Sequence, residues 1–140
     1  MSIAMPAAEE SRVRIEPPTL DRTGRIRAEG LADTERNFAI ATHLSLLAAV
    51  ILGPLVIALP LIIWLARKDQ SDFNNDHGRE VTNVAITGLL ASFFLVWIPI
   101  LGWGALAIWC VVIFINLIRG AVAAGNGEYF RYPMTIRFLS

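Results

Sequence analysis

Charged residues are scarce in this chain of 140 residues, at 17% against roughly a quarter in a typical soluble domain. Two long tracts, residues 37–66 and 81–118, contain no Asp, Glu, Lys or Arg. An apolar run of about 18 residues or more predicts a membrane span, because hydrocarbon offers the backbone no partner outside its own helix. Both tracts exceed that length, so water is not expected to be the only solvent of the protein.

Three further absences narrow the class of protein. The formal net charge is zero, and without a basic stripe we expect no nucleic acid as a partner. The single cysteine, Cys110, excludes an internal disulfide. No short apolar core with a small-residue cleavage site precedes the first tract, so we expect that tract to direct insertion itself, without a removable signal peptide.

Catalytic motifs are also lacking. Neither tract holds a pair of carboxylates, and the chain has no glycine-rich phosphate loop and no nucleophile elbow. His77 lies near three acids, Asp69, Asp72 and Asp76, but acids interspersed with basic residues are more typical of a solvated loop than of a metal site. We therefore expect no enzyme, no cofactor and no metal; an enzyme acting on lipid would have only these residues to work with.

The second tract predicts a helical hairpin. As one helix it would extend about 57 Å, nearly twice the roughly 30 Å of hydrocarbon in a bilayer. The sequence WIPILGW offers the break, because Pro99 lacks an amide donor, Gly102 permits unusual dihedrals, and the flanking tryptophans suit the membrane interface. We expect helices at about 81–98 and 103–119.

A hairpin is also predicted for the first tract, with helices at about 37–52 and 54–66, although length alone would allow one bent or tilted helix of about 45 Å. A single crossing would divide the twelve Lys and Arg equally between the two sides, whereas a turn at Gly53 and Pro54 leaves all of them on one face, as the positive-inside tendency favours. Helices this short span only about 20–23 Å. The expected fold class is therefore all-α integral membrane, with four transmembrane or partly re-entrant helices in two hairpins.

The flanking segments complete the expected organisation. We predict a mobile polar N-terminal tail at 1–36 and a membrane domain at 37–139, which includes a cytoplasmic connector at 67–80 and an interfacial tail at 120–139. Both termini then lie on the cytoplasmic side of a multi-pass protein in the bacterial cytoplasmic (inner) membrane, with the lipid bilayer as a partner.

Three polar side chains within the tracts are candidates for an intramembrane layer. His43 is the one imidazole in either tract, and Asn83 and Asn116 lie at similar depths in the two-hairpin arrangement. A buried ionisable residue in a membrane is expensive and so indicates either a role in packing or a functional site. The layer would fix the register of the helices or line a hydrated vestibule, and we favour the first.

Other residues are candidates for packing or docking. Gly88 and Ser92 form a small-residue pair one helical turn apart, Ser45 belongs to a similar pair, and such faces let another helix approach closely. Trp64, followed by two cations, predicts an interfacial anchor.

The sequence GEYFRYP near the end of the chain places aromatic residues beside a cation. Tyr129 and Tyr132 would lie at headgroup depth, while Arg131 would reach a phosphate or a loop carboxylate. The same strip would also serve to dock another protein.

The motifs THLS, PLIIWLARKDQSDFNNDHGREVTN and AAGNGEYFRYPMTIRF, in this order, resemble a family of small bacterial membrane proteins of unknown function. That family is grouped with the twenty-kilodalton membrane subunit of the chloroplast inner-envelope import translocon. The resemblance covers Arg36 to Leu139 and implies four membrane helices with both termini in the cytoplasm, but no particular reaction.

These observations predict a non-enzymatic accessory or assembly subunit that packs against other integral membrane proteins or against copies of itself. The alternative is a small transporter or a component of a protein-translocation channel, in which the polar layer around His43 would form the path.

Overall fold

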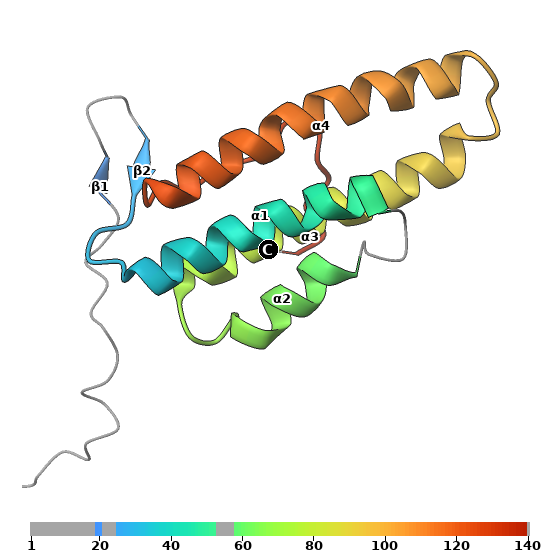
Figure 1. The fold of residues 1–140 in the computed structure, drawn as a ribbon. Helices are drawn as coiled ribbons and strands as arrows, with labels where there is room; N and C mark the ends of the chain where they lie inside the picture. Colours follow the sequence, from blue (N-terminus) through green and yellow to red (C-terminus); the bar gives the residue numbers. More distant parts are fainter. Residues whose placement is uncertain (1–18, 21–24, 53–57, 140) are drawn as a thin grey trace, which may run out of the picture.

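The computed structural model describes residues 19–20, 25–52 and 58–139, which form four helices and a small β-ribbon. The elements, in chain order, are β1 (Thr19–Leu20), β2 (Ile26–Arg27), α1 (Asp33–Leu52), α2 (Leu59–Arg67), α3 (Asp72–Leu95) and α4 (Leu101–Gly125). Figure 1 shows α1, α3 and α4 running alongside one another, with the short α2 beside them. Helices α1 and α3 each contact the other three helices.

The turn between α3 and α4 lies within the segment that the sequence indicated. It occupies residues 96–100 and contains Ile100 at φ 65°, an uncommon conformation for a β-branched residue. Position 102 requires glycine, because a Cβ there would lie 2.0 Å from the carbonyl oxygen of Leu95. The indole of Trp103 donates to the Val96 carbonyl at 3.0 Å and closes the turn.

The expected connector at 67–80 differs most from the structure, because α3 begins at Asp72 instead of near residue 81. Ser71 has the extended backbone of an N-cap, and Asp72 places a negative charge at the positive end of the helix dipole. Phe73 is fully buried, and this apolar contact stabilises the first turn of α3. The turn-forming residues around it gave no indication of such a contact. The helix continues without a break into the apolar tract.

The first tract contains two separate helices, α1 and α2, whose proposed turn at Gly53 and Pro54 lies outside the described residues. Helix α1 begins at Asp33, four residues before the expected start, where the carboxylate of Glu35 accepts the backbone N–H of Ala32 at 3.0 Å as in a capping box. Helix α2 has nine residues and extends about 14 Å, less than half the thickness of the hydrocarbon.

Part of the expected N-terminal tail is ordered against the end of α4. Strand β1 pairs antiparallel with β2, and the backbone around β2 pairs in turn with the segment after α4 through Ala28 N–H to Gly127 O at 2.9 Å. Gly127 has φ +76° and forms the left-handed C-terminal cap of α4. Ala28 and Leu31 are buried in this contact. The described residues of the predicted polar tail, 19–20 and 25–36, are therefore structured.

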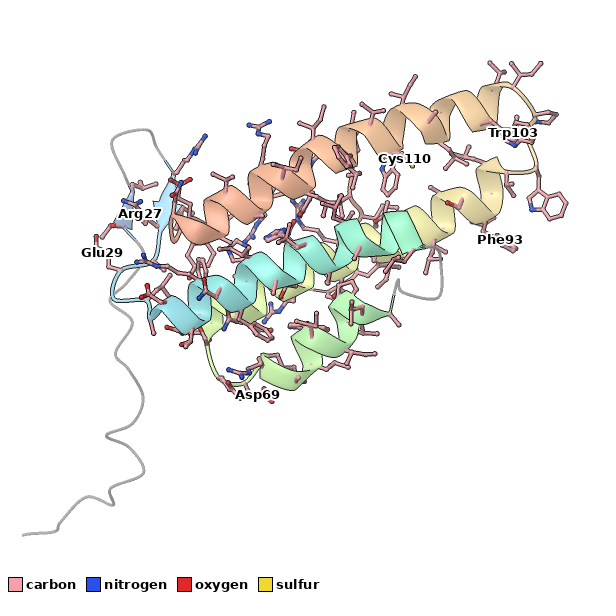
Figure 2. All side chains as sticks on the ribbon, viewed as in Figure 1. Arg27, Glu29, Asp69, Phe93, Trp103 and Cys110 are labelled. Atoms are coloured by element: carbon pink, nitrogen blue, oxygen red, sulfur yellow. The ribbon has the colours of Figure 1, made fainter. Side chains whose placement is uncertain are left out.

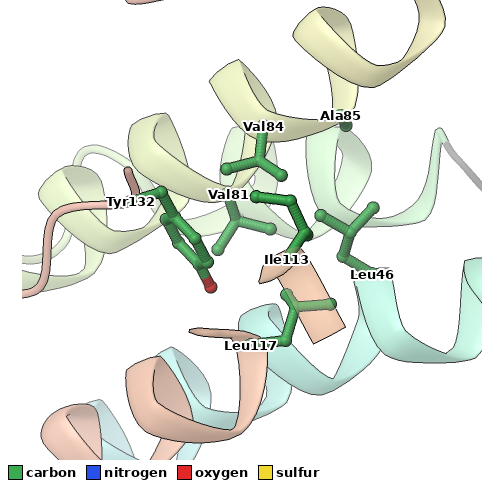
Figure 3. Packing of buried hydrophobic residues seen from close by; sticks show 7 residues of the cluster. All are labelled: Leu46, Val81, Val84, Ala85, Ile113, Leu117 and Tyr132. Atoms are coloured by element: carbon green, nitrogen blue, oxygen red, sulfur yellow. The ribbon is translucent and has the colours of Figure 1, made fainter. Parts of the chain in front are cut away.

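The buried core lies toward this charged end of the bundle. Figure 3 shows its larger cluster, which consists of Leu46, Val81, Val84, Ala85, Ile113, Leu117 and Tyr132. A second cluster, Ala28, Leu31, Ala39, Phe73 and Ala124, lies nearer to the β-ribbon.

The opposite end of the α3–α4 hairpin is apolar and exposed. Trp97 is 77% exposed, Leu101 78% and Trp103 61%. In Figure 2, Phe93 and Trp103 lie at the far end of the hairpin from Arg27 and Glu29. Among the described residues, α4 is the one helix long and apolar enough to cross a membrane by length and composition.

Candidate functional site

A buried hydrogen-bonded chain joins three elements within the charged end. His43 of α1 contacts the Tyr132 hydroxyl through Nδ1 at 2.5 Å and His77 of α3 through Nε2 at 2.8 Å. The other nitrogen of His77, Nε2, lies 3.1 Å from the carbonyl oxygen of Glu128. Both imidazoles are fully buried and Tyr132 is 2% exposed. We call His43, His77 and Tyr132 the imidazole chain.

The partners fix where the protons lie in this chain. A backbone carbonyl only accepts, so His77 Nε2 carries hydrogen and donates to Glu128. In neutral His77 the remaining nitrogen, Nδ1, must accept, so His43 Nε2 donates to it. His43 Nδ1 then accepts from the Tyr132 hydroxyl. Every polar atom of both rings is satisfied when both imidazoles are neutral, and the chain runs in one direction.

Close packing surrounds the imidazole chain. Phe73 lies edge-on to His77 with 4.4 Å between ring centroids, and Tyr129 stacks on His77 at 6.3 Å. On the α4 side, Gly120 faces His43 and the Tyr132 hydroxyl so closely that a Cβ would lie 2.7 Å from the His43 ring. The chain is therefore held by three helices and the C-terminal segment, with no room for a larger residue at Gly120.

Carboxylates on α3 hold the side chains of the C-terminal segment. Asp76 accepts two bonds from the Arg131 guanidinium, at 2.6 and 2.7 Å, which is the bidentate geometry of a strong ion pair. The buried carboxylate of Glu80 accepts from Arg137 Nε at 2.9 Å and from the Tyr132 backbone N–H at 3.3 Å. The segment after α4 is thus attached to α3 by charge-assisted bonds.

Two uncharged residues of α3 hold the backbone of the same segment. The Asn83 side chain accepts the N–H groups of Phe138 and Leu139 at 3.1 and 3.0 Å, and it donates to the Leu139 carbonyl at 3.1 Å. Thr87 accepts the Ile136 N–H at 3.0 Å. We refer to Asp76, Glu80, Asn83 and Thr87 as the α3 polar stripe.

The candidate polar layer is not brought together as one group. His43 bonds to Tyr132 and His77, Asn83 bonds to the end of the chain, and Asn116 donates to the Val112 carbonyl of its own helix at 2.8 Å. Sequence reasoning singled out His43 but placed its partner His77 in a solvated connector. No local signal links two residues separated by 89 positions, as His43 and Tyr132 are.

The other candidate residues have varied surroundings. Ser45 donates to the Thr42 carbonyl within α1, Ser92 is exposed, and the Trp109 ring lies where a Cβ on Gly88 would fall. Trp64 donates through its indole to Asn75 at 2.9 Å and covers Gly78, so it packs against α3. These contacts are all within the chain.

The aromatic strip points inward more than expected. Tyr132 lies in the core and Tyr129 packs on Phe73, so neither ring is a freely exposed interfacial anchor. Of the two alternatives, a phosphate or a carboxylate, Arg131 contacts a carboxylate, that of Asp76, which lies within α3 and not in a loop. Its hydrogen bond to Asp76 raises the pKa of Arg131, and burial raises the pKa of both tyrosines, most strongly for Tyr132.

The geometry suits a structural clamp. Within the part of the chain that is described, no group of three or more His, Cys, Asp or Glu residues could hold a metal ion. Both nitrogens of each imidazole are already engaged, and Asp76 and Glu80 are paired with arginines. The bonds fix helices α1 and α3 and the final segment relative to one another.

The stability of this clamp is expected to decrease in acid. Burial lowers the pKa of His77, which lies before the apolar tract begins, from 6.5 to about 4, although the nearby Asp76 and the Glu128 carbonyl act in the opposite direction. Above pH 6.5 the ring is neutral in both states. Below it the unfolded chain takes up a proton while the folded chain does not, so the free energy of unfolding should fall by about 3 kcal/mol between pH 6.5 and 4.

Unfolding in detergent as a function of pH measures this effect. The variant His77→Asn cannot titrate at this position, so its decline between pH 6.5 and 4 should be shallower than that of the unmodified chain. An equally steep decline in both proteins would contradict the assignment to His77.

Comparison with known proteins identifies the family of this chain. No curated protein and no solved structure matches the chain. The model of the magnetosome magnetite crystal formation protein family, MamF/MmsF, matches residues 34–139. This confirms a small bacterial membrane-associated family, and the kinship with the chloroplast import subunit stays a prediction. Because the match covers nearly all of α1, the whole of α2, α3 and α4, and the final segment, the chain belongs to the MamF/MmsF magnetosome magnetite crystal formation protein family.

Proposed function

We propose that the chain is a non-enzymatic accessory protein of a bacterial membrane, which places its α3–α4 hairpin in the bilayer and presents its charged end to a partner protein. The family's description supports a non-enzymatic role, because it names magnetite crystal formation at the magnetosome and no catalysed reaction. The proposal assigns the partner surface to the charged end and the lipid surface to the hairpin.

The exposed hairpin end carries the proposal. Phe93, Phe94, Trp97 and Trp103 are each at least 61% exposed and lie together around the turn. Burying one large apolar side chain is favourable by roughly 1.5–3 kcal/mol, so a cluster of this kind is costly in water and stable in hydrocarbon. The apolar face of α4 continues from this cluster toward the charged end.

The clamp supplies the second half of the role. The C-terminal segment, fixed to the α3 polar stripe, and the β-ribbon, paired to the same segment, give the charged end a defined surface. A preformed surface binds a partner without a large ordering cost. We infer that both termini and the clamp lie on the cytoplasmic side, since the basic residues gather there.

Transport is the alternative, and the imidazole chain is the feature that favours it. A proton path needs groups at both ends that can gain and lose a proton. Here one end is the backbone carbonyl of Glu128, which accepts a hydrogen bond but does not carry a proton onward. The chain therefore supports orientation of the helices better than conduction.

Membrane extraction tests the lipid-facing role. The variant Phe94→Asp places a charge in the exposed apolar end of the hairpin, which is costly in hydrocarbon, and should raise the fraction of the protein released from the membrane by alkaline carbonate. Leu20→Asp is the matched control, because Leu20 is equally apolar and 73% exposed but lies in the β-ribbon. Release of the unmodified chain by carbonate would overturn the proposal.

The partner surface needs a separate measurement. Purification of the full chain in a gentle detergent should recover a second membrane protein at fixed stoichiometry, and the complex should be weakened when Arg131→Gln removes the ion pair between the final segment and Asp76. Recovery of a homo-oligomer alone, with a measurable flux in vesicles, would favour the transporter.

A further inference from the structure

A cavity at the charged end of α4 remains outside the clamp. Its volume is about 360 Å³, and its walls include Arg25, Ile118, Arg119, Val122, Glu128 and Tyr129. Helix α4 therefore contributes apolar side chains together with Arg119, while Arg25 and Glu128 come from segments outside α4. A volume of this size suits a small polar group with an attached apolar portion.

The charges in the cavity leave a positive excess. Arg25 and Glu128 form an ion pair at 2.9 Å, in which Glu128 is largely covered. Arg119 is exposed and, among the described residues, has no hydrogen bond or ion pair. Two guanidinium groups and one carboxylate leave a net charge of one positive, which matches a singly charged phosphodiester.

An exposed apolar stripe on α4 leads directly into this cavity. Val111, Ile115, Ile118 and Val122 recur at helical spacing and are between 46% and 60% exposed. At 1.5 Å per residue the stripe from Val111 to Val122 is about 16 Å long, which equals about one leaflet of a bilayer with a hydrocarbon core of roughly 30 Å. Its last two members also line the cavity.

We propose that this cavity binds the headgroup of an anionic phospholipid whose acyl chain lies along the α4 stripe. The phosphodiester would accept hydrogen bonds from Arg119, beside the existing pair of Arg25 and Glu128, while the ring of Tyr129 covers the glycerol region. Arg119 lies between the last two members of the stripe, Ile118 and Val122, where its cation can attract an anionic headgroup at the membrane surface. This proposal rests on the proposed membrane insertion and adds the lipid class.

Lipid binding to the purified full chain tests the site. In a neutral detergent, phosphatidylglycerol should bind more tightly than phosphatidylcholine, as counted by native mass spectrometry over a titration. Arg119→Gln should weaken phosphatidylglycerol binding about fivefold, because one cation near an anionic headgroup contributes about 1 kcal/mol. Phosphatidylcholine has the same phosphodiester but also a choline cation, so its binding should weaken less than that of phosphatidylglycerol.

Matched variants make the result specific. Arg79→Gln removes the same charge from α3, outside the cavity, and should keep the preference for phosphatidylglycerol. Arg119→Lys retains the charge and should keep most of it. Equal binding by Arg119→Gln and the unmodified chain, or an equal loss in Arg79→Gln, would overturn the site.

Two further measurements distinguish failure of the lipid site from failure of the proposed membrane insertion. If inorganic phosphate or glycerol phosphate displaced the lipid at similar concentration, the cavity would bind soluble phosphate and the lipid proposal would fail. Carbonate extraction of the same proteins reports on membrane insertion independently. A chain that stays in the membrane but shows no preference for phosphatidylglycerol would refute the headgroup site alone.

Discussion

Replacing Gly120 with alanine is expected to destabilise the protein by about 2–4 kcal/mol. The added Cβ would lie 2.7 Å from two atoms of the His43 ring and 2.9 Å from the Tyr132 hydroxyl oxygen, which is closer than real Cβ contacts allow. Overpacking of a filled core costs about 1–3 kcal/mol, and displacement of the His43–Tyr132 hydrogen bond adds about 1 kcal/mol. Neither ring can withdraw, because both are buried and bonded.

The same helix provides a control for this substitution. A Cβ on Gly104 would have nothing within 4 Å, so Gly104→Ala should stabilise α4 by up to about 1 kcal/mol through helix propensity alone. Reversible unfolding of both variants in mixed detergent micelles gives the two free energies. Similar values for the two substitutions would show that Gly120 does not serve close packing.

The apolar architecture could be predicted from the sequence because its signals are local. The absence of charge across two tracts located the helices, and Pro99 with Gly102 located the turn of the α3–α4 hairpin. Capping at Asp33 and the continuation of α4 to Gly125 shifted the boundaries, since helix ends depend on contacts with the rest of the chain.

The start of α3 was not predicted, because its residue types are typical of turns. Asn, Asp and Gly between residues 74 and 78 favour turns, yet here Gly78 permits Trp64 to lie against the helix, where a Cβ would be 2.2 Å from the indole ring. A local signal was present, because Asp76, Glu80, Asn83 and Thr87 recur at helical spacing. That stripe continues the period of the apolar tract and could have extended α3 toward its observed beginning.

The imidazole chain could be predicted only in part. A histidine in an apolar tract indicates that a partner exists, which is why His43 stood out. The partner's identity depends on how the final segment folds back over α3, and that is set by non-local ion pairs such as Arg131 with Asp76. Periodicity along a single helix carries no information about such a pairing.

Replacing His43 with leucine should reduce the free energy of unfolding by about 3 kcal/mol. The substitution leaves the buried Tyr132 hydroxyl without an acceptor and His77 Nδ1 without a donor, and each unsatisfied group costs about 1–3 kcal/mol. Tyr132→Phe alone should cost about 1–3 kcal/mol, since it leaves only one group, His43 Nδ1, without its partner.

The double variant His43→Leu with Tyr132→Phe distinguishes packing from transport. If the two residues act through their shared bond, the loss in the double variant should be smaller than the sum of the single losses by about 0.5–3 kcal/mol, because the unsatisfied hydroxyl has been removed. A proton pathway predicts something different: the single variant His43→Leu would abolish flux in vesicles while its unfolding free energy stayed near that of the unmodified chain. Strictly additive losses of unfolding free energy, together with lost flux, would therefore refute the clamp. Non-additive losses are expected, because the hydrogen-bonded chain ends at the Glu128 carbonyl and holds three elements together.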